Sequence, residues 1–175
     1  MVDRLYVIAL RVFRVLPRRA RRWVVRAGSP KYTVGAICIV VRRDGAILLA
    51  QHSYVSRWGT PGGLAKRREY PDAAAVRETM EEVNLPIEVV GEPAVVVEPR
   101  PRRVDVVFLA RPVPGAPLDD VRPSSPEIVS GAGFQPEDLP ELQTETATAL
   151  VALARSGRID LAGSGLTPWS DRPTR

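Results

Sequence analysis

The sequence contains few of the side chains that most often act as nucleophiles or bind transition metals. Its 175 residues include one cysteine, Cys38, and one histidine, His52. A single cysteine excludes an intrachain disulfide framework, and no Cys/His grouping resembles a zinc site. With one histidine and no Gly-x-Ser-x-Gly motif, the chain does not read as a Ser-His-Asp hydrolase. We expect Cys38 to be a buried core thiol and His52 to be structural or exposed at a strand end.

Long apolar runs are also missing. The apolar stretch near the N-terminus is interrupted by arginines, so it does not predict a transmembrane span. It also lacks the continuous core and cleavage site of a signal peptide. There is no Walker loop and no Gly-x-Gly-x-x-Gly motif, which excludes nucleotide binding by those two routes. The length suits one domain with its own core, and the sparse cysteine fits a cytoplasmic protein.

Positive charge is concentrated at the N-terminus. Residues 1–31 hold nine Arg or Lys and one acid, which gives them a charge of +8. Because the whole chain carries +5, the remaining residues together carry −3. The basic charge therefore belongs to an arm, and we expect no specific nucleic-acid partner. Residues 2–26 have helical periodicity, with an apolar face opposite four arginines that project close together, Arg4, Arg11, Arg18 and Arg22. Pro17 predicts a kink or the start of a second helix.

Three interpretations of this basic amphipathic helical arm, residues 1–30, stay open. It packs on the domain or on a partner subunit, it lies peripherally on an anionic inner-membrane surface, or it is a loosely ordered extension. Gly28-Ser29-Pro30 separates it from a predicted domain at 31–156. The Gly/Ser/Pro-rich residues 157–175 predict a flexible C-terminal tail.

The domain reads as alternating strands and helices. Strands are predicted at 32–41, 47–52, 87–90, 94–98, 104–110 and 127–134, with a hairpin turn at Arg43-Asp44-Gly45. One helix follows Pro71 and a second spans 142–154. Strands on both sides of a central helix, with a closing helix, predict an α/β fold in which helices cover both faces of a mixed sheet.

The most informative stretch runs from Trp58 to Leu85, WGTPGGLAKRREYPDAAAVRETMEEVNL. Glu78, Glu81 and Glu82 have the i, i+3, i+4 spacing that places three carboxylates on one helix face. Such a cluster alone is usually a solvated face. Here the glycine turn, Glu69 and Arg77 stand in register before it, and three close carboxylates favour a hard divalent cation.

This stretch resembles the Nudix box, in which a glycine, five residues, Glu, seven residues and Arg-Glu precede a Glu-Glu pair. The matching residues are Gly63, Glu69, Arg77, Glu78, Glu81 and Glu82. Two positions depart from the pattern. Thr79 replaces an aliphatic residue that packs beneath the helix, and Asn84 replaces the glycine that ends it, a position that asparagine tolerates.

The resemblance implies a Nudix-type α/β/α sandwich and a metal-dependent pyrophosphohydrolase. The Gly62 carbonyl with Glu78, Glu81 and Glu82 would hold Mg²⁺ or Mn²⁺, Glu81 directly or through water. The cation would activate water for attack on a phosphorus of a diphosphate. Arg77 would pair with Glu69 and hold the loop against the helix.

Other roles follow less directly. The general base would be a box glutamate, Glu81 or Glu82, or a downstream acid, for which Glu127 is the candidate. The arginines of a basic turn would neutralise substrate phosphates, or they are a solvated hairpin tip. Two aromatic rings would flank a base or sugar, or they pack in the core or a loop. These substrate-binding candidates are Tyr54, Trp58, Arg100, Arg102 and Arg103.

The substrate ranking favours a nucleoside diphosphate derivative such as ADP-ribose, followed by an oxidised or ordinary nucleoside triphosphate. Pro101, sixteen residues past Leu85, matches a proline associated with ADP-ribose pyrophosphatases. Two alternatives stay open, a non-catalytic nucleotide sensor and a membrane-surface hydrolase of a lipid-linked diphosphate. A homodimer is expected by analogy only.

Overall fold

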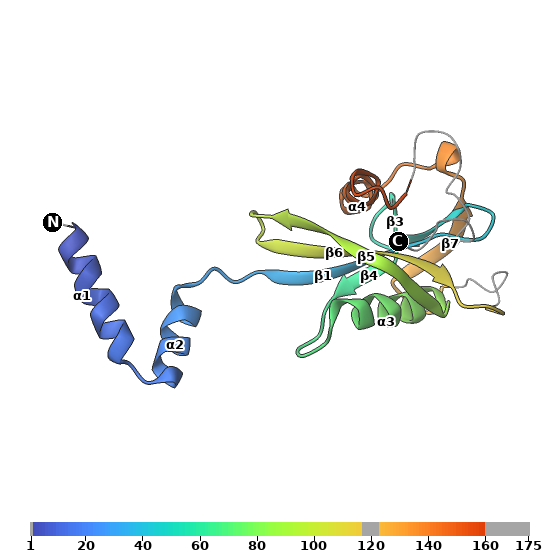
Figure 1. The fold of residues 1–175 in the computed structure, drawn as a ribbon. Helices are drawn as coiled ribbons and strands as arrows, with labels where there is room; N and C mark the ends of the chain where they lie inside the picture. Colours follow the sequence, from blue (N-terminus) through green and yellow to red (C-terminus); the bar gives the residue numbers. More distant parts are fainter. Residues whose placement is uncertain (1, 117–122, 160–175) are drawn as a thin grey trace. The chain divides into compact units, whose positions relative to one another are not determined.

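The computed structural model describes residues 2–116 and 123–159, in two compact units that divide between Tyr32 and Thr33 (Figure 1). The first unit holds two helices, α1 (Val2–Val15) and α2 (Arg18–Gly28). Pro17 is the N-cap of α2, so of the two predicted outcomes, a kink or a new helix, the chain forms a new helix. Arg18 and Arg22 therefore lie on a different helix from Arg4 and Arg11, and the single four-arginine face expected from one continuous helix is wrong.

The second unit holds two sheets and two α-helices. Its elements are β1 (Thr33–Val40), β2 (Ile47–His52), β3 (Trp58–Gly59), β4 (Gly62–Leu64), α3 (Pro71–Val83), β5 (Ile87–Glu98), β6 (Arg103–Pro112), β7 (Ile128–Phe134), a 3₁₀ turn (Pro136–Asp138) and α4 (Thr144–Arg155). One sheet has the order β4-β1-β6-β5, in which only the β1–β6 pair is parallel. The other has the order β3-β2-β7 and is antiparallel.

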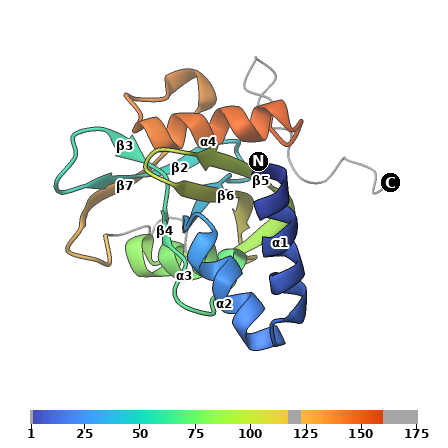
Figure 2. The ribbon, with the colours of Figure 1, turned by 90° about the vertical axis from the view of Figure 1, so that its left-hand side faces the viewer.

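Strand β1 is buried on both faces, which is how the sheet comes to lie between two helices. Ala36, Cys38 and Val40 belong to the core cluster that includes Ala74, Ala75 and Val83 of α3. The intervening Ile37, Ile39 and Val41 belong to the cluster that includes Ala149, Leu150 and Leu153 of α4. Alternate side chains of a strand point to opposite faces, so α3 and α4 cover opposite faces of the sheet (Figures 1 and 2). The predicted α/β/α arrangement with a mixed sheet is confirmed.

Two local predictions need correction. The Arg43-Asp44-Gly45 turn does join β1 to β2, but these strands enter different sheets and share one bridge, Val41 to Ile47, instead of forming a hairpin. The strands predicted at 87–90 and 94–98 are one strand, β5, with a register shift between Val90 and Ala94. Gly91 in the left-handed region (φ 66°) accommodates the bulge without ending the strand.

Two predictions concern the ends of the chain, the flexible tail and the absence of a transmembrane span. Residues 160–175, which make up most of the predicted tail, lie outside the described residues. None of the helices that the structure describes is both long enough and apolar enough to cross a membrane.

Candidate active site

Helix α3 carries the acidic residues, and its two ends are built as the sequence predicts. Pro71 stands at the first helical position and Asp72 in the first turn, where a missing N–H and a negative charge are both favourable. At the other end Asn84 adopts the left-handed conformation (φ 51°, ψ 36°), and its N–H donates to Met80 O. The expectation that asparagine replaces glycine here without harm is confirmed.

Thr79, the other departure from the box pattern, is fully buried beneath the helix. Its hydroxyl donates to the Ala75 carbonyl oxygen at 2.8 Å, so burial leaves no unsatisfied donor. It also interacts with the Cys38 thiol, whose pKa burial raises to about 12. Cys38 is therefore the inert core thiol that the sequence predicts, and a polar side chain fills the aliphatic position.

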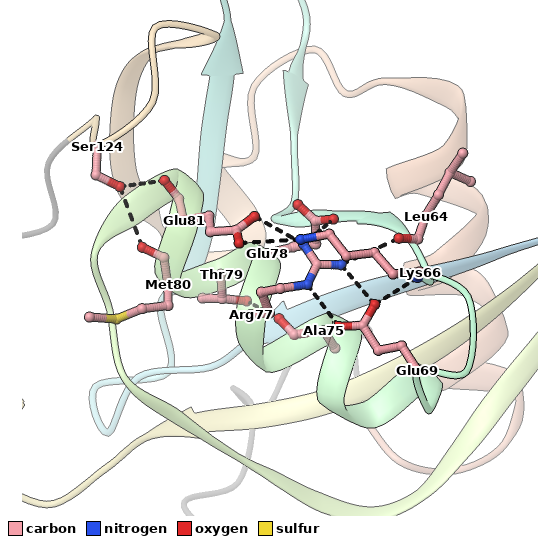
Figure 3. A network of polar contacts seen from close by, with 10 residues as sticks. All are labelled: Leu64, Lys66, Glu69, Ala75, Arg77, Glu78, Thr79, Met80, Glu81 and Ser124. Carbon is pink, nitrogen blue, oxygen red and sulfur yellow. Dashed lines mark hydrogen bonds and ion pairs between the residues drawn. The ribbon is translucent and has the colours of Figure 1, made fainter.

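Arg77 lies at the centre of an ion-pair network that also contains Glu69, Glu78 and Glu81 (Figure 3). Its Nε and Nη2 donate to the two carboxylate oxygens of Glu69 at 2.8 and 3.0 Å, which is a bidentate pair. Its Nη1 donates to Glu78 at 2.8 Å and to Glu81 at 2.9 Å. We call these four residues the Arg77 network.

The network fixes the loop before α3 to the helix. Glu69 also accepts a hydrogen bond from the Lys66 backbone N–H at 2.7 Å, and Arg77 Nη2 donates to the Leu64 carbonyl at 3.4 Å. The hydrogen bond from Arg77 is the main reason that the pKa of Glu69 falls to about 2. Arg77 therefore binds both the loop and its neighbouring carboxylates.

Glu82 has the opposite environment, although it belongs to the same helix. It is 9% exposed, and its Oε2 is buried without a hydrogen-bond partner among the described residues. Burial, and then the negative charge of Glu78, raise its pKa to about 8. A buried carboxylate oxygen without a partner is costly, so Glu82 is held in a position that a cation would stabilise.

The two glycines of β4 bring the backbone against these carboxylates. A Cβ at Gly63 would collide with the Glu78 carboxylate, and one at Gly62 would collide with the Ala36 carbonyl of β1. The Gly62 backbone N–H also donates to Glu82. Only glycine at these two positions lets β4 lie this close to β1 and to the Glu78 carboxylate. Glu78 and Glu82 therefore both contact β4.

The residues at this point fit a divalent cation in part. Glu82 supplies a buried oxygen without a partner, and Glu78 lies close enough to raise its pKa. Glu81 is turned toward Arg77 and toward Lys66, at 3.6 Å. Within residues 2–116 and 123–159 no three acidic, His or Cys side chains gather closely enough to form a complete metal centre. Of the predicted metal set, Glu78 and Glu81 share Arg77 Nη1, and both lie close enough to Glu82 to raise its pKa, Glu78 more strongly.

Glu127 approaches the same region from the segment before β7. It is exposed, and its charge raises the pKa values of both Glu82 and Tyr54 and opposes the lowering of the pKa of His52 by burial. Ser124 joins this segment to the end of α3. Its N–H donates to the Glu82 carbonyl at 3.0 Å, and its hydroxyl donates to the Glu81 carbonyl at 2.5 Å (Figure 3). A downstream acid therefore lies near the buried glutamate.

A cavity of about 430 Å³ borders Gly62 and Gly63 on one side. The predicted substrate residues Tyr54 and Arg103 line it. Sequence reasoning did not assign the other polar residues of its wall. They come from the end of β2, the segments on either side of β3 and the start of α4: His52, Arg57, Thr60, Gln143, Thr144, Glu145 and Thr146.

Contacts between distant segments of the chain form this wall, so no local sequence pattern predicts it. Gln143 Nε2 lies 3.2 Å from His52 Nδ1 and donates to the Arg57 carbonyl, across more than 80 residues of chain. Thr60 is 8% exposed, and its hydroxyl is buried without a hydrogen-bond partner among the described residues. The only sequence signal was the position of His52 at a strand end.

The remaining candidates lie elsewhere. Trp58 packs edge-to-face on Phe134, with ring centroids 4.9 Å apart, in the core on the α4 side, which is the packing alternative foreseen for it. Arg100 and Arg102 are exposed at the turn between β5 and β6. Arg103 pairs with the buried Asp105 at 2.7 Å, so of the three arginines only Arg103 both reaches the cavity and is held in place.

Known proteins share the fold of the second unit. A family model described as NUDIX domain matches residues 31–154. Among solved structures, an ADP-ribose pyrophosphatase from Streptococcus suis is 25% identical over 74% of this chain and 95% of its own, with a TM-score of 0.61.

Two further solved structures share the fold. A MutT NUDIX hydrolase from Burkholderia pseudomallei is 27% identical over 71% of this chain and 99% of its own, with a TM-score of 0.58. An Ap4A hydrolase from C. elegans, at 24% identity and a TM-score of 0.56 over 70% of this chain and 96% of its own, resembles it in fold alone. No curated protein matches the chain.

Proposed function

The chain belongs to the Nudix family of hydrolases, and on this premise we propose that it cleaves the diphosphate bond of a nucleoside diphosphate derivative. The buried glutamate is the observation that carries the proposal. Glu82 holds an unpartnered carboxylate oxygen beside Glu78, at a pair of glycines that form one edge of the cavity. A folded chain keeps such an arrangement at a cost, which a bound cation and its phosphate ligands would offset.

Glu78 and Glu82, with the Gly62 carbonyl, would hold Mg²⁺ or Mn²⁺, and Glu81 would join them directly or through water. When bound, the cation supplies charge neutralisation on the phosphate oxygens and lowers the pKa of water. The Arg77 network keeps Glu78 in place without contacting substrate. Glu127 lies near enough to interact electrostatically with Glu82 and Tyr54, so it would accept a proton from the attacking water.

The cavity would receive the part of the substrate outside the diphosphate. Arg103 would neutralise phosphate charge there, while Gln143 and the Thr60 hydroxyl provide hydrogen-bonding groups of both kinds. We rank an ADP-ribose-like substrate first, because the pyrophosphatase from Streptococcus suis is 25% identical over nearly its whole length. A nucleoside triphosphate ranks second.

The test is a panel of ADP-ribose, other nucleoside diphosphate derivatives and nucleoside triphosphates, incubated with Mg²⁺ or Mn²⁺ and with chelator, followed by product identification. We expect at least one compound to be split at its diphosphate, and only with the cation. If a compound binds and none is consumed with either cation, the sensor alternative replaces this proposal. Consumption that is unchanged by chelator would remove the role assigned to Glu78 and Glu82.

A further inference from the structure

The second helix of the arm has two faces of opposite chemistry. Apolar side chains recur with i, i+3, i+4, i+7 spacing at Ala20, Trp23, Val24 and Ala27. At 100° per residue they fall within an arc of roughly 100°. The opposite arc holds five arginines, Arg18, Arg19, Arg21, Arg22 and Arg26. No residue of α2 is buried, and the Trp23 side chain is 72% exposed.

Helix α1 is more apolar but is organised in the same way. Its charged residues, Asp3, Arg4, Arg11 and Arg14, fall on one side of the helical wheel. The wider apolar arc is open to solvent at Tyr6, Ile8, Val12 and Val15, the last of which is 83% exposed. Several large apolar side chains exposed on one helix are typical of an interaction surface.

The positive charge of the arm exceeds what its own acidic residues can neutralise. Residues 2–28 hold eight arginines. The arm contains one acidic residue, Asp3. Its positive charge is therefore not neutralised locally, and the occupant of this surface has to supply both negative charge and an apolar environment.

We propose that residues 2–28 bind the surface of an anionic lipid bilayer. The two helices would lie in the interface, with their apolar arcs at the boundary of headgroups and acyl chains and their arginines on the headgroups. Trp23 suits this depth, because indole combines an apolar ring with a polar N–H. Charge complementarity selects anionic over neutral lipid.

Two other occupants fit less well. Nucleic-acid phosphates would satisfy the arginines but would leave the apolar arcs of both helices in water. A second copy of the arm would match those arcs but would bring eight more arginines alongside the first eight. An anionic bilayer meets both requirements.

The test uses the full chain with vesicles of phosphatidylcholine alone or with about 30% phosphatidylglycerol, at roughly 0.1 M salt. We expect co-sedimentation with the anionic vesicles only, and at least a tenfold loss when residues 2–28 are deleted. Tryptophan emission should shift to the blue on binding. In a Trp169→Phe background, which removes the third tryptophan, that shift should disappear on Trp23→Phe while sedimentation persists, because Trp58 is already packed in the core.

Paired variants separate the contributions of charge and apolar surface. Arg18→Ser/Arg22→Ser and Trp23→Ser/Val24→Ser should each weaken vesicle binding several-fold. The charge-matched control Arg43→Ser/Arg155→Ser removes two exposed arginines of the second unit and should bind as wild type does. Glu82→Gln should also bind normally, because this proposal is independent of the hydrolase chemistry.

Several results would overturn it. Equal sedimentation of the deletion variant, equal binding to neutral vesicles, or an equal loss in the control pair would each show that the arm does not recognise anionic lipid. Binding to a duplex oligonucleotide with no binding to vesicles would assign the arginines to nucleic acid instead.

Discussion

Helix α3 carries glutamates of the same kind in two contrasting environments. At one, Glu78 and Glu81 lie against Arg77, which also binds Glu69 and lowers its pKa to about 2. At the other, Glu82 is buried with one oxygen unpartnered and its pKa raised to about 8. The contrast shows that one arginine satisfies the carboxylates that position the loop and leaves the neighbouring carboxylate available for a ligand.

The largest effect should come from removing the unpartnered carboxylate. Glu82→Gln should lower diphosphate hydrolysis by about a thousandfold, on the scale of lost electrostatic stabilisation at an active site. The Glu81 carboxylate already pairs with Arg77 and Lys66, so Glu81→Gln should lower the hydrolysis rate by only about tenfold to a hundredfold. Steady-state kinetics with saturating Mg²⁺ would measure both, with the exposed Glu137→Gln as the control. If Glu82→Gln and Glu81→Gln lowered the hydrolysis rate equally, the two glutamates would not differ in role as their environments indicate.

The next effect concerns the acid that approaches Glu82 from the segment before β7. Glu127→Gln should reduce kcat by about a hundredfold and alter its pH dependence, since loss of a general base typically costs this much. The amide keeps the shape of the side chain, so thermal stability should stay unchanged. A variant with the wild-type rate and pH profile would show that Glu127 takes no part in proton transfer.

A smaller effect should follow from changing the centre of the Arg77 network. Lysine in Arg77→Lys cannot reach Glu69 through two parallel bonds while also holding Glu78 and Glu81. We expect kcat to fall about tenfold, KM to change little, and stability to drop by about 1–3 kcal/mol. The matched control is Arg155→Lys on an exposed surface of α4. A rise in KM alone would mean that Arg77 binds substrate, contrary to its contacts here.

The smallest effects are on stability, and they should have opposite pH dependence at the two environments. The folded-state pKa of Glu69 is depressed, so its contribution is present above pH 4.5 and is lost as the pH falls toward 2. Glu69→Gln should therefore flatten the acid limb of the stability curve. The folded-state pKa of Glu82 is raised, so its ionisation destabilises the protein as the pH rises from 4.5 to 8.

In metal-free protein Glu82→Gln should consequently be more stable than wild type by roughly 2–4 kcal/mol at pH 8, with the difference vanishing below pH 4.5. Chemical denaturation across this pH range, in the presence of chelator, measures both variants. If both curves shifted in the same direction, the two environments would not differ as described.

Local pattern was enough to predict the elements that depend on neighbouring residues in the chain. The resemblance to the box implied the pair of Arg77 with Glu69. The C-terminal position of Asn84 followed from its tolerance of positive φ, and a run rich in β-branched residues located β1. These features are set within a few residues of chain, where propensity and capping act directly.

Contacts between distant segments could not be predicted in this way. Nothing around Gly45 indicates that β1 and β2 enter different sheets, because strand pairing is decided elsewhere in the fold. The wall of the cavity likewise depends on Gln143 meeting His52 across 91 residues. Trp58 could line a site or fill a core by sequence alone, and only Phe134, from β7, decides between them.

The two hydrogen bonds from Ser124 give the downstream segment a fixed anchorage on the carbonyls that end α3. A carboxylate 45 residues along the chain from Glu82 is thereby tethered to the same helix terminus as Glu82 itself. We therefore expect a rearrangement of that terminus to move both acids together. Under the role proposed for Glu127, this anchorage would preserve the geometry of proton transfer without any chemical role for the Ser124 side chain.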